Sequence, residues 1–306
     1  MALPASSPGF LLLLPDFLLI LGGFLLCRFT PLNRPLWDAV ERLVYVVLFP
    51  ALLFTAIVRQ PLELATLWPL ALGGVGVAVL GIALALGLGR WPGVDARLHA
   101  SGAQVAFRFN SYVALALAER LAGSAGVAWM ALIVALCVPL CNLGAVWPLA
   151  RHGGQGLGGA LLRNPLILAT VSGLAFNLAG ARLPDAAALT LQRVGSAALP
   201  LGLMAVGAGL QLGALREGPR LAVVLLGIRH LVLPAAAIAG VLAWGLPPAQ
   251  QAVVVAFAAM PTASSCYVLA VRMGGHGPYV AGMVTVSTLL AMLGLPLTLM
   301  VLQALR

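Results

Sequence analysis

Residues 104–112 read QVAFRFNSY, and residues 255–265 read VAFAAMPTASS. Both stretches place Val-Ala-Phe before polar residues inside an otherwise apolar segment, and the two copies of that tripeptide lie 150 residues apart. Residues 48–53 recur loosely at 198–203 with the same offset. Repeats that each hold an odd number of membrane spans insert upside down relative to each other, which is typical of secondary transporters. The repeat therefore predicts a membrane protein with a substrate site where its two halves meet.

The composition places the chain in a bilayer. Of its 306 residues, 62% are hydrophobic and only 8% are charged, whereas a soluble domain carries about 25% charged residues. The net charge of +9 comes from 17 basic residues, all arginine, scattered between apolar segments. They form no basic face, so the sequence predicts the lipid bilayer and not nucleic acid as a partner. The N-terminus lacks the basic region of a signal peptide, so we expect a retained first span.

Ten runs are apolar enough to cross a bilayer as a helix, which takes about 20 residues. They fall at roughly 9–27, 37–58, 66–89, 101–121, 127–150, 164–181, 189–212, 220–244, 250–273 and 279–304. We therefore predict an all-α polytopic membrane protein with ten transmembrane helices in two inverted five-helix repeats. Residues 1–150 form the first repeat, residues 151–163 a cytoplasmic linker, and residues 164–306 the second repeat.

The arginines indicate the orientation of the spans. With the N-terminus outside, ten arginines fall on the cytoplasmic side and five on the outer side, as the positive-inside rule favours. The sequence therefore predicts a multi-pass protein of the plasma (inner) membrane with both termini outside. Only Arg108 and Arg229 are left inside spans.

Spans four and nine, at 101–121 and 250–273, are the least membrane-like. Pro261 removes an intrahelical hydrogen bond and clashes with the preceding turn. Backbone groups that lose their hydrogen bonds at membrane depth must line a cavity or be buried in protein. A helix whose N-terminus lies at that depth attracts anions. The alternative is a kinked, packed helix whose Thr and Ser side chains bond their own carbonyls. Because Pro261 is repeat-equivalent to residues 108–110, we expect broken helices and a site.

Arg108 lies in the middle of span four, where a buried cation costs several kcal/mol unless it is compensated. It pairs with a substrate carboxylate, pairs with a protein carboxylate such as Asp16, or reaches an aqueous cavity, and we favour the first. The predicted substrate-binding residues are Arg108, Asn110, Ser111, Tyr112, Pro261, Thr262, Ser264 and Ser265.

Other polar residues inside spans have competing interpretations. Asp16 is either a proton-coupling carboxylate or a residue of the outer interface, and His230 is a candidate proton relay. Arg229, beside it, is a candidate for a local ion pair. Asn142 and Asn177 are expected to bridge helices.

The sequence carries no motif for catalysis or for a cofactor. Cys137 and Cys141 share a helix face with no His or acidic residue nearby in sequence, so small apolar packing is favoured over a metal site. Neither a Ser–His pairing nor a His-Glu-x-x-His motif appears, which argues against an intramembrane hydrolase. We expect no enzyme activity, no metal and no cofactor. A homodimer is compatible with the sequence, which defines no oligomeric state.

Four stretches resemble the auxin efflux carrier family, whose bacterial members are often called malate permeases. The stretches are 163–168 with Phe176 and Asn177, 194–201 with 207–210, 260–265 with Ala270, and 17–22 with Leu25 and Arg28. They resemble the sixth, seventh, ninth and first spans of that family, and the match to the seventh span is the most specific. The chain is thus similar to a bacterial malate-permease-like member.

This resemblance implies the fold of the bile acid:sodium symporters, in which spans one, two, six and seven form a scaffold. Spans three to five and eight to ten then form a moving domain, with broken spans four and nine crossing in it. Asn110 matches the family's crossover Asn and Pro261 its crossover Pro. The family usually places Gly and Pro soon after that Asn, whereas residues 113–118 contain neither. Its substrates are organic anions, which in bacteria include small carboxylates such as malate and malonate.

The combined prediction is a secondary active or facilitative transporter that exports or exchanges a small carboxylate by alternating access. Pro50 and Pro200, at equivalent positions of the repeat, would loosen the scaffold helices that face the moving domain. A sodium-coupled organic-anion symporter of the bile acid type and a passive channel are the alternatives. The coupling ion, the substrate and the direction of transport are not defined by the sequence.

Overall fold

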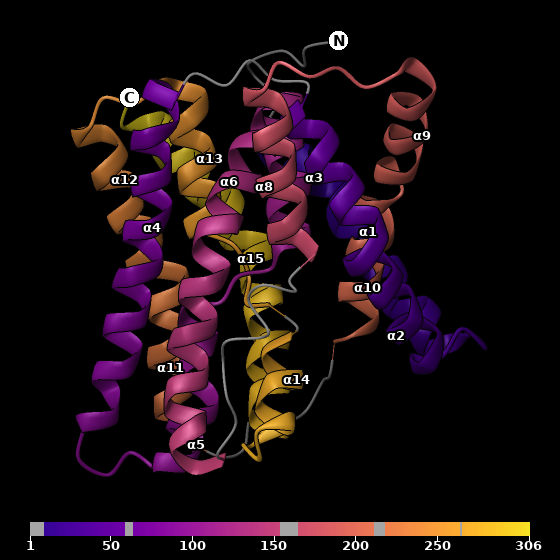
Figure 1. The fold of residues 1–306 in the computed structure, drawn as a ribbon. Helices are drawn as coiled ribbons and strands as arrows, with labels where there is room; N and C mark the ends of the chain where they lie inside the picture. Colours follow the sequence, from indigo (N-terminus) through magenta and orange to yellow (C-terminus); the bar gives the residue numbers. More distant parts are fainter. Residues whose placement is uncertain (1–8, 59–63, 154–164, 211–217, 264) are drawn as a thin grey trace.

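The computed structural model describes residues 9–58, 64–153, 165–210, 218–263 and 265–306. Within these ranges the chain is helical, apart from turns and one isolated β-bridge between Phe109 and Thr262 (Figure 1). The helices are α1 (Gly9–Phe29), α2 (Arg34–Leu43), the π-helical turn η1 (Val44–Leu48), α3 (Phe49–Val58), α4 (Leu64–Gly87), η2 (Leu88–Arg90), α5 (Ala96–Gly102), η3 (Ala103–Ala106), α6 (Ser111–Gly153), α8 (Pro165–Leu178), α9 (Asp185–Ser196), α10 (Ala198–Ala208), α11 (Pro219–Gly227), the π-helical turn η4 (Ile228–Val232), α12 (Leu233–Ala243), α13 (Pro248–Ala258), α14 (Ser265–Arg272) and α15 (Gly277–Ala304).

Six helical stretches of the described chain are long and apolar enough to cross a membrane. They are Arg34–Val58, Leu67–Arg90, Ser111–Leu149, Asp185–Ala208, Pro219–Ala243 and Gly277–Ala304, and two shorter apolar helices are Phe17–Phe29 and Pro248–Ala258. An α-helical integral membrane protein is therefore confirmed. The arrangement of ten helices in two inverted repeats, the domain boundaries and the side on which each terminus lies stay predictions. The predicted linker falls largely outside the described residues, at 154–164.

Helix α6 contains most of predicted spans four and five. Its backbone leaves the helical conformation at Ala122 (φ −146°, ψ 21°) and Gly123 (φ 58°, ψ −145°). The left-handed φ at the second position favours glycine, which has no Cβ to clash. The reversal expected between the two spans therefore lies at residues 122–123.

The helices pack in two groups. Group one consists of α1, α2, α3, α8, α9 and α10 with η1, and in it α1 packs on α10 while α3 packs on α8 and α9. Group two contains α4, α5, α6 and α11 to α15 with η2, η3 and η4, and in it α6 packs on α4 and α13. Figure 1 shows α1, α9 and α10 on one side of the molecule and α4, α11 and α12 on the other.

Glycines allow the closest helix contact of group one. A Cβ atom on Gly23 of α1 would overlap the main chain of Met204, and one on Gly207 of α10 would overlap the main chain of Ile20. Small residues at a helix interface let backbones approach closely, which supplies the van der Waals packing that holds helices together in lipid. This contact joins the first predicted span to the seventh.

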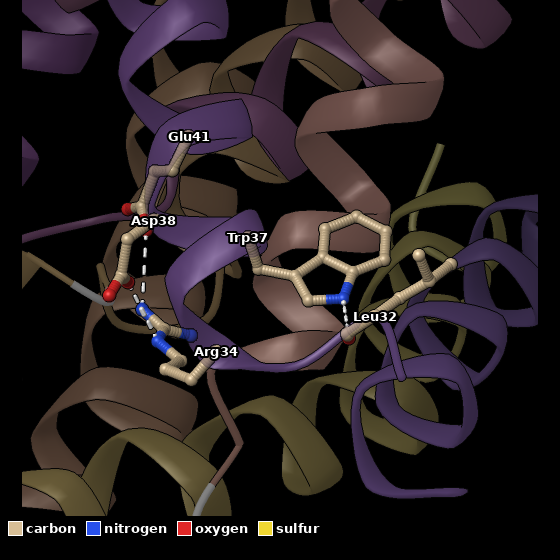
Figure 2. A network of polar contacts seen from close by, with 5 residues as sticks. All are labelled: Leu32, Arg34, Trp37, Asp38 and Glu41. Atoms are coloured by element: carbon tan, nitrogen blue, oxygen red, sulfur yellow. Dashed lines mark hydrogen bonds and ion pairs between the residues drawn. The ribbon is translucent and has the colours of Figure 1, made fainter. Parts of the chain in front are cut away.

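The start of α2 is polar and anchored. The Arg34 guanidinium lies 2.8 Å from the Asp38 carboxylate and 3.5 Å from that of Glu41, and the buried Trp37 indole N–H donates to the Leu32 carbonyl at 2.9 Å (Figure 2). Neighbours three and four residues apart on a helix face each other, which explains the pairing of Arg34 with Asp38. Arg34, Asp38 and Glu41, at this end of the second predicted span, thus form ion pairs within α2.

Two helix irregularities of group one precede prolines. Pro50 follows the π-helical turn η1, and Pro200 follows Ala197, where α9 gives way to α10. A proline lacks an N–H and its ring clashes with the carbonyl four residues earlier. Those earlier positions are Val46, inside η1, and Ser196, the last residue of α9, so both irregularities lie where the clash occurs. Whether the two prolines ease movement of the helices stays a prediction.

Candidate functional site

Two helices are interrupted at the same place. The first, α5 with η3, ends at Ala106 and resumes as α6 at Ser111, while α13 ends at Ala258 and resumes as α14 at Ser265. The break predicted at Pro261 is therefore present, and a break also exists in span four. We call the two non-helical segments that the structure describes, residues 107–110 and 259–263, the crossover.

The crossover segments satisfy each other's backbone groups. The Asn110 N–H donates to the Pro261 carbonyl at 2.9 Å, and the Ala263 N–H donates to the Arg108 carbonyl at 3.4 Å. The Thr262 hydroxyl donates to the Val105 carbonyl at 2.8 Å. Polar backbone groups at membrane depth need such partners because no water replaces them there. The pairing explains how both helices can be broken inside the protein.

Asn110 explains why α6 begins without a nearby Gly or Pro. Its side-chain oxygen accepts hydrogen bonds from the N–H groups of Tyr112 at 3.0 Å and Val113 at 3.3 Å. This is the bonding of a helix N-cap, a position at which Asn is strongly preferred. The missing Gly and Pro after Asn110 are therefore no obstacle to a break.

A cavity of about 170 Å³ lies at the crossover. Its lining residues are Tyr45, Arg108, Phe109, Ser111, Val138, Cys141, Asn142, Ala263 and Ser265. Tyr45 comes from η1 of group one, and the others come from the crossover, α6 and α14 of group two. The first residues of α6 and α14 both line the cavity, so two positive helix ends meet there.

The predicted site residues separate into two sets. Arg108, Ser111 and Ser265 line the cavity. Asn110, Pro261 and Thr262 are buried and bond the crossover backbone. These three, with Tyr112, are not among the described lining residues.

Tyr112 belongs to the packing between the two groups. Its ring stacks on Phe49 of α3 with centroids 4.6 Å apart and planes 5° apart. Such stacking contributes packing energy beyond the buried area alone. Ser264 lies outside the described residues, so nothing is assigned to it.

Arg108 is a half-buried cation held by neutral groups. Its guanidinium donates to the Gln104 side-chain oxygen at 2.9 Å, to the Ser265 hydroxyl at 3.1 Å and to the Ser265 carbonyl at 3.4 Å. The Gln104 amide in turn donates to the carbonyls of Ser101 and Cys266 at 3.0 and 3.2 Å. Among the described side chains, no carboxylate lies within 4.0 Å of Arg108. The side chain of Asp16, the proposed alternative partner, is not among them.

Arg229 has a role that sequence reasoning missed. This residue of η4 is only 1% exposed, and its guanidinium donates to the carbonyls of Met260 at 2.6 Å and Phe257 at 3.3 Å. It therefore caps the C-terminal end of the half-helix α13, where a cation is favourable. We expected a local ion pair, but no described carboxylate lies within 4.0 Å. The sequence feature that could have predicted this role is the position of Arg229 inside predicted span eight, which is followed by span nine with its predicted break.

His230 is connected to the crossover through one serine. Its Nε2 lies 2.8 Å from the Ser287 hydroxyl, which accepts a hydrogen bond from the Thr262 N–H at 2.9 Å. A proton-coupling role for His230 stays a prediction, as does one for Asp16, whose side chain is not described.

The two intramembrane asparagines differ. Asn177 of α8 donates to the carbonyls of Ile57 at 2.8 Å and Val58 at 3.3 Å in α3, so it bridges helices as expected. Asn142, for which the same role was expected, instead lines the cavity. Cys141 also lines it, and its thiol donates to the Phe107 carbonyl at 3.5 Å.

Residues 157–299 match the family model described as "Membrane transport protein". This match indicates a membrane transporter. It covers most of the second half of the chain and supports the resemblance to the auxin efflux carrier family, and the family it describes is one of transporters rather than enzymes. The malate-permease-like subgroup stays a prediction. No curated protein matches the chain.

Proposed function

We propose that the protein is a secondary carrier of small organic anions, in particular carboxylates such as malate or malonate, that works by alternating access. The observation that carries this proposal is the position of Arg108. Its guanidinium lines a cavity at which two half-helices begin, and no described carboxylate lies within 4.0 Å of it.

The electrostatics of the cavity favour an anion. Each helix N-terminus carries a partial charge of roughly +0.5, and the starts of α6 and α14 add theirs to the full charge of Arg108. Three positive charges in one cavity repel one another, so a bound carboxylate stabilises all of them. The planar guanidinium also matches a carboxylate geometrically and can bind it through two parallel hydrogen bonds.

The position of the cavity fits alternating access. It lies between group one, which supplies Tyr45, and group two, which supplies the other described lining residues. Movement of group two against group one would carry the crossover and its ligand together. We further propose that the protein lies in the plasma membrane with both termini outside and that it exports or exchanges its substrate.

Transport by purified protein in liposomes tests the proposal. We expect saturable uptake of radiolabelled malate or malonate and its acceleration by unlabelled carboxylate on the other side. Uptake without saturation or counterflow would indicate a channel, and an absolute requirement for sodium would favour a symporter of the bile acid type. The first result would contradict the proposed carrier, and the second would replace it with the symporter alternative.

Arg108→Lys sharpens this test, because lysine keeps the positive charge but lacks the planar guanidinium that can bind a carboxylate through two hydrogen bonds. We expect the apparent affinity for carboxylate to fall about tenfold, the equivalent of one charge-assisted hydrogen bond. Arg193→Lys is the matched control, since Arg193 is an exposed residue of α9. An unchanged affinity in Arg108→Lys would argue against direct contact with the substrate.

A further inference from the structure

Tyr45 lines the cavity and carries a hydroxyl group. It lies in the π-helical turn η1 and is half-buried, and its side chain has no hydrogen-bond partner within the described residues. A π-helical turn inserts one extra residue into a helix and is frequent at functional sites. Of the described lining residues, Tyr45 alone comes from group one.

Asn142 lines the same cavity and carries a side-chain amide. Val138, Cys141 and Asn142 share one face of α6 because they are three and four residues apart. The Asn142 side chain is half-buried and likewise has no partner in the part of the chain that the structure describes. A primary amide offers two N–H donors and one oxygen acceptor. Inside a membrane protein such groups are costly unless water or a ligand satisfies them.

These two groups differ in chemistry from Arg108. Arg108 is the single charged side chain among the described lining residues, whereas Tyr45 and Asn142 are neutral donors and acceptors. A carboxylate suits the first, and a hydroxyl or carbonyl oxygen suits the second. A purely hydrocarbon substituent would leave both neutral groups unpaired, which lowers affinity.

We infer that Tyr45 and Asn142 select carboxylates that carry an additional uncharged oxygen, such as 2-hydroxy or 2-oxo acids. This inference rests on the proposed function, since it assumes that a carboxylate binds Arg108. It assigns substrate specificity to Tyr45 and Asn142, which were not among the substrate-binding residues predicted from the sequence. The selected substrates share a hydroxyl or carbonyl group and are not defined by their chain length.

Pairs of ligands that differ by one hydroxyl group test the inference. The pairs are malate with succinate and lactate with propionate, and their dissociation constants are measured by calorimetry on the purified, full-length protein in detergent. We expect the hydroxylated member of each pair to bind about three- to tenfold more tightly, the equivalent of one net hydrogen bond. Tyr45→Phe and Asn142→Leu should each reduce this ratio toward one.

Tyr267→Phe is the matched control. Tyr267 is a half-buried residue of α14 that is not among the described lining residues, so this variant should keep the wild-type ratio. Equal binding of both members by the wild-type protein, or an unchanged ratio in both Tyr45→Phe and Asn142→Leu, overturns the inference and leaves the proposed function standing. Absence of any carboxylate binding by the wild-type protein overturns both. The wild-type comparison needs no variant to fold.

Discussion

Arg108 and Arg229 both lie inside predicted spans beside the crossover. Their side chains lie at opposite ends of the broken helices, Arg229 at a C-terminus and Arg108 at two N-termini. Arg229 is 1% exposed and donates to two carbonyls at the C-terminal end of α13. Arg108 is half-buried and lies at the N-terminal ends of α6 and α14. A helix stabilises a cation at its C-terminus and repels one at its N-terminus. The same side chain therefore completes the fold in one place and requires an anion in the other.

The largest expected effect is a loss of stability when Arg229, the arginine that caps α13, is replaced. Arg229→Met removes the guanidinium and leaves two buried carbonyls unsatisfied, which costs about 1–3 kcal/mol for each. We expect the thermal midpoint of the purified protein to fall by about 5–10 °C. The exposed residue Arg193 gives the control, because Arg193→Met should leave the midpoint unchanged. A midpoint equal to that of the wild type would show that Arg229 does not hold the end of α13.

Neutralising the other arginine should affect binding rather than stability. Arg108→Gln removes the charge from the cavity, and we expect carboxylate affinity to fall about 100-fold, as for loss of strong charge-assisted hydrogen bonds. The thermal midpoint without ligand should stay at or above that of the wild type, because a cation near two positive helix ends is removed. Calorimetry and thermal unfolding measure the two quantities on one preparation.

The double variant Arg108→Gln with Asp16→Asn separates a ligand site from an internal ion pair. If Arg108 serves the substrate, the double variant should remain unable to bind carboxylates. Recovery of binding and transport in the double variant would mean that Arg108 and Asp16 neutralise each other, and the proposed anion site would be wrong.

A smaller effect is expected from the residue that orients Arg108. Ser265→Ala removes the hydroxyl that accepts from the guanidinium at 3.1 Å, while the bonds to Gln104 and to the Ser265 carbonyl remain. We expect affinity to fall about threefold to tenfold. Ser196→Ala, which removes a hydroxyl bonded within α9, is the control. A loss as large as that of Arg108→Gln would mean that Ser265 itself makes the main contact with the ligand.

The sequence predicted the positions of the apolar helices and of both breaks. Pro261 could be found without a structure because a proline removes a backbone N–H whatever its surroundings. Asn110 was found through its resemblance to the crossover Asn of the family. The absence of Gly and Pro after Asn110 was misleading, because a helix that starts at an N-cap needs neither residue.

Of the residues predicted to bind substrate, only Arg108, Ser111 and Ser265 are among the described lining residues of the cavity. Asn110 and Thr262 were expected to bind substrate, but the oxygen atoms that bind a ligand also cap helices, and here they bond the backbone. Tyr45, Asn142 and Arg229 depend on how helices far apart in sequence rotate against one another. Helix periodicity shows which residues share a face, but not what that face meets.

The bonding of the crossover also has a consequence for synthesis of the chain. Val105 and Thr262, joined by a hydrogen bond, are 157 residues apart. At ribosomal rates of about 5–20 residues per second, on the order of ten seconds separate their emergence. During that interval residues 107–110 lack the backbone partners that Pro261 and Ala263 supply, and unpaired backbone groups are costly in lipid. The first five predicted spans therefore complete this hydrogen bonding only after the ninth has been synthesised.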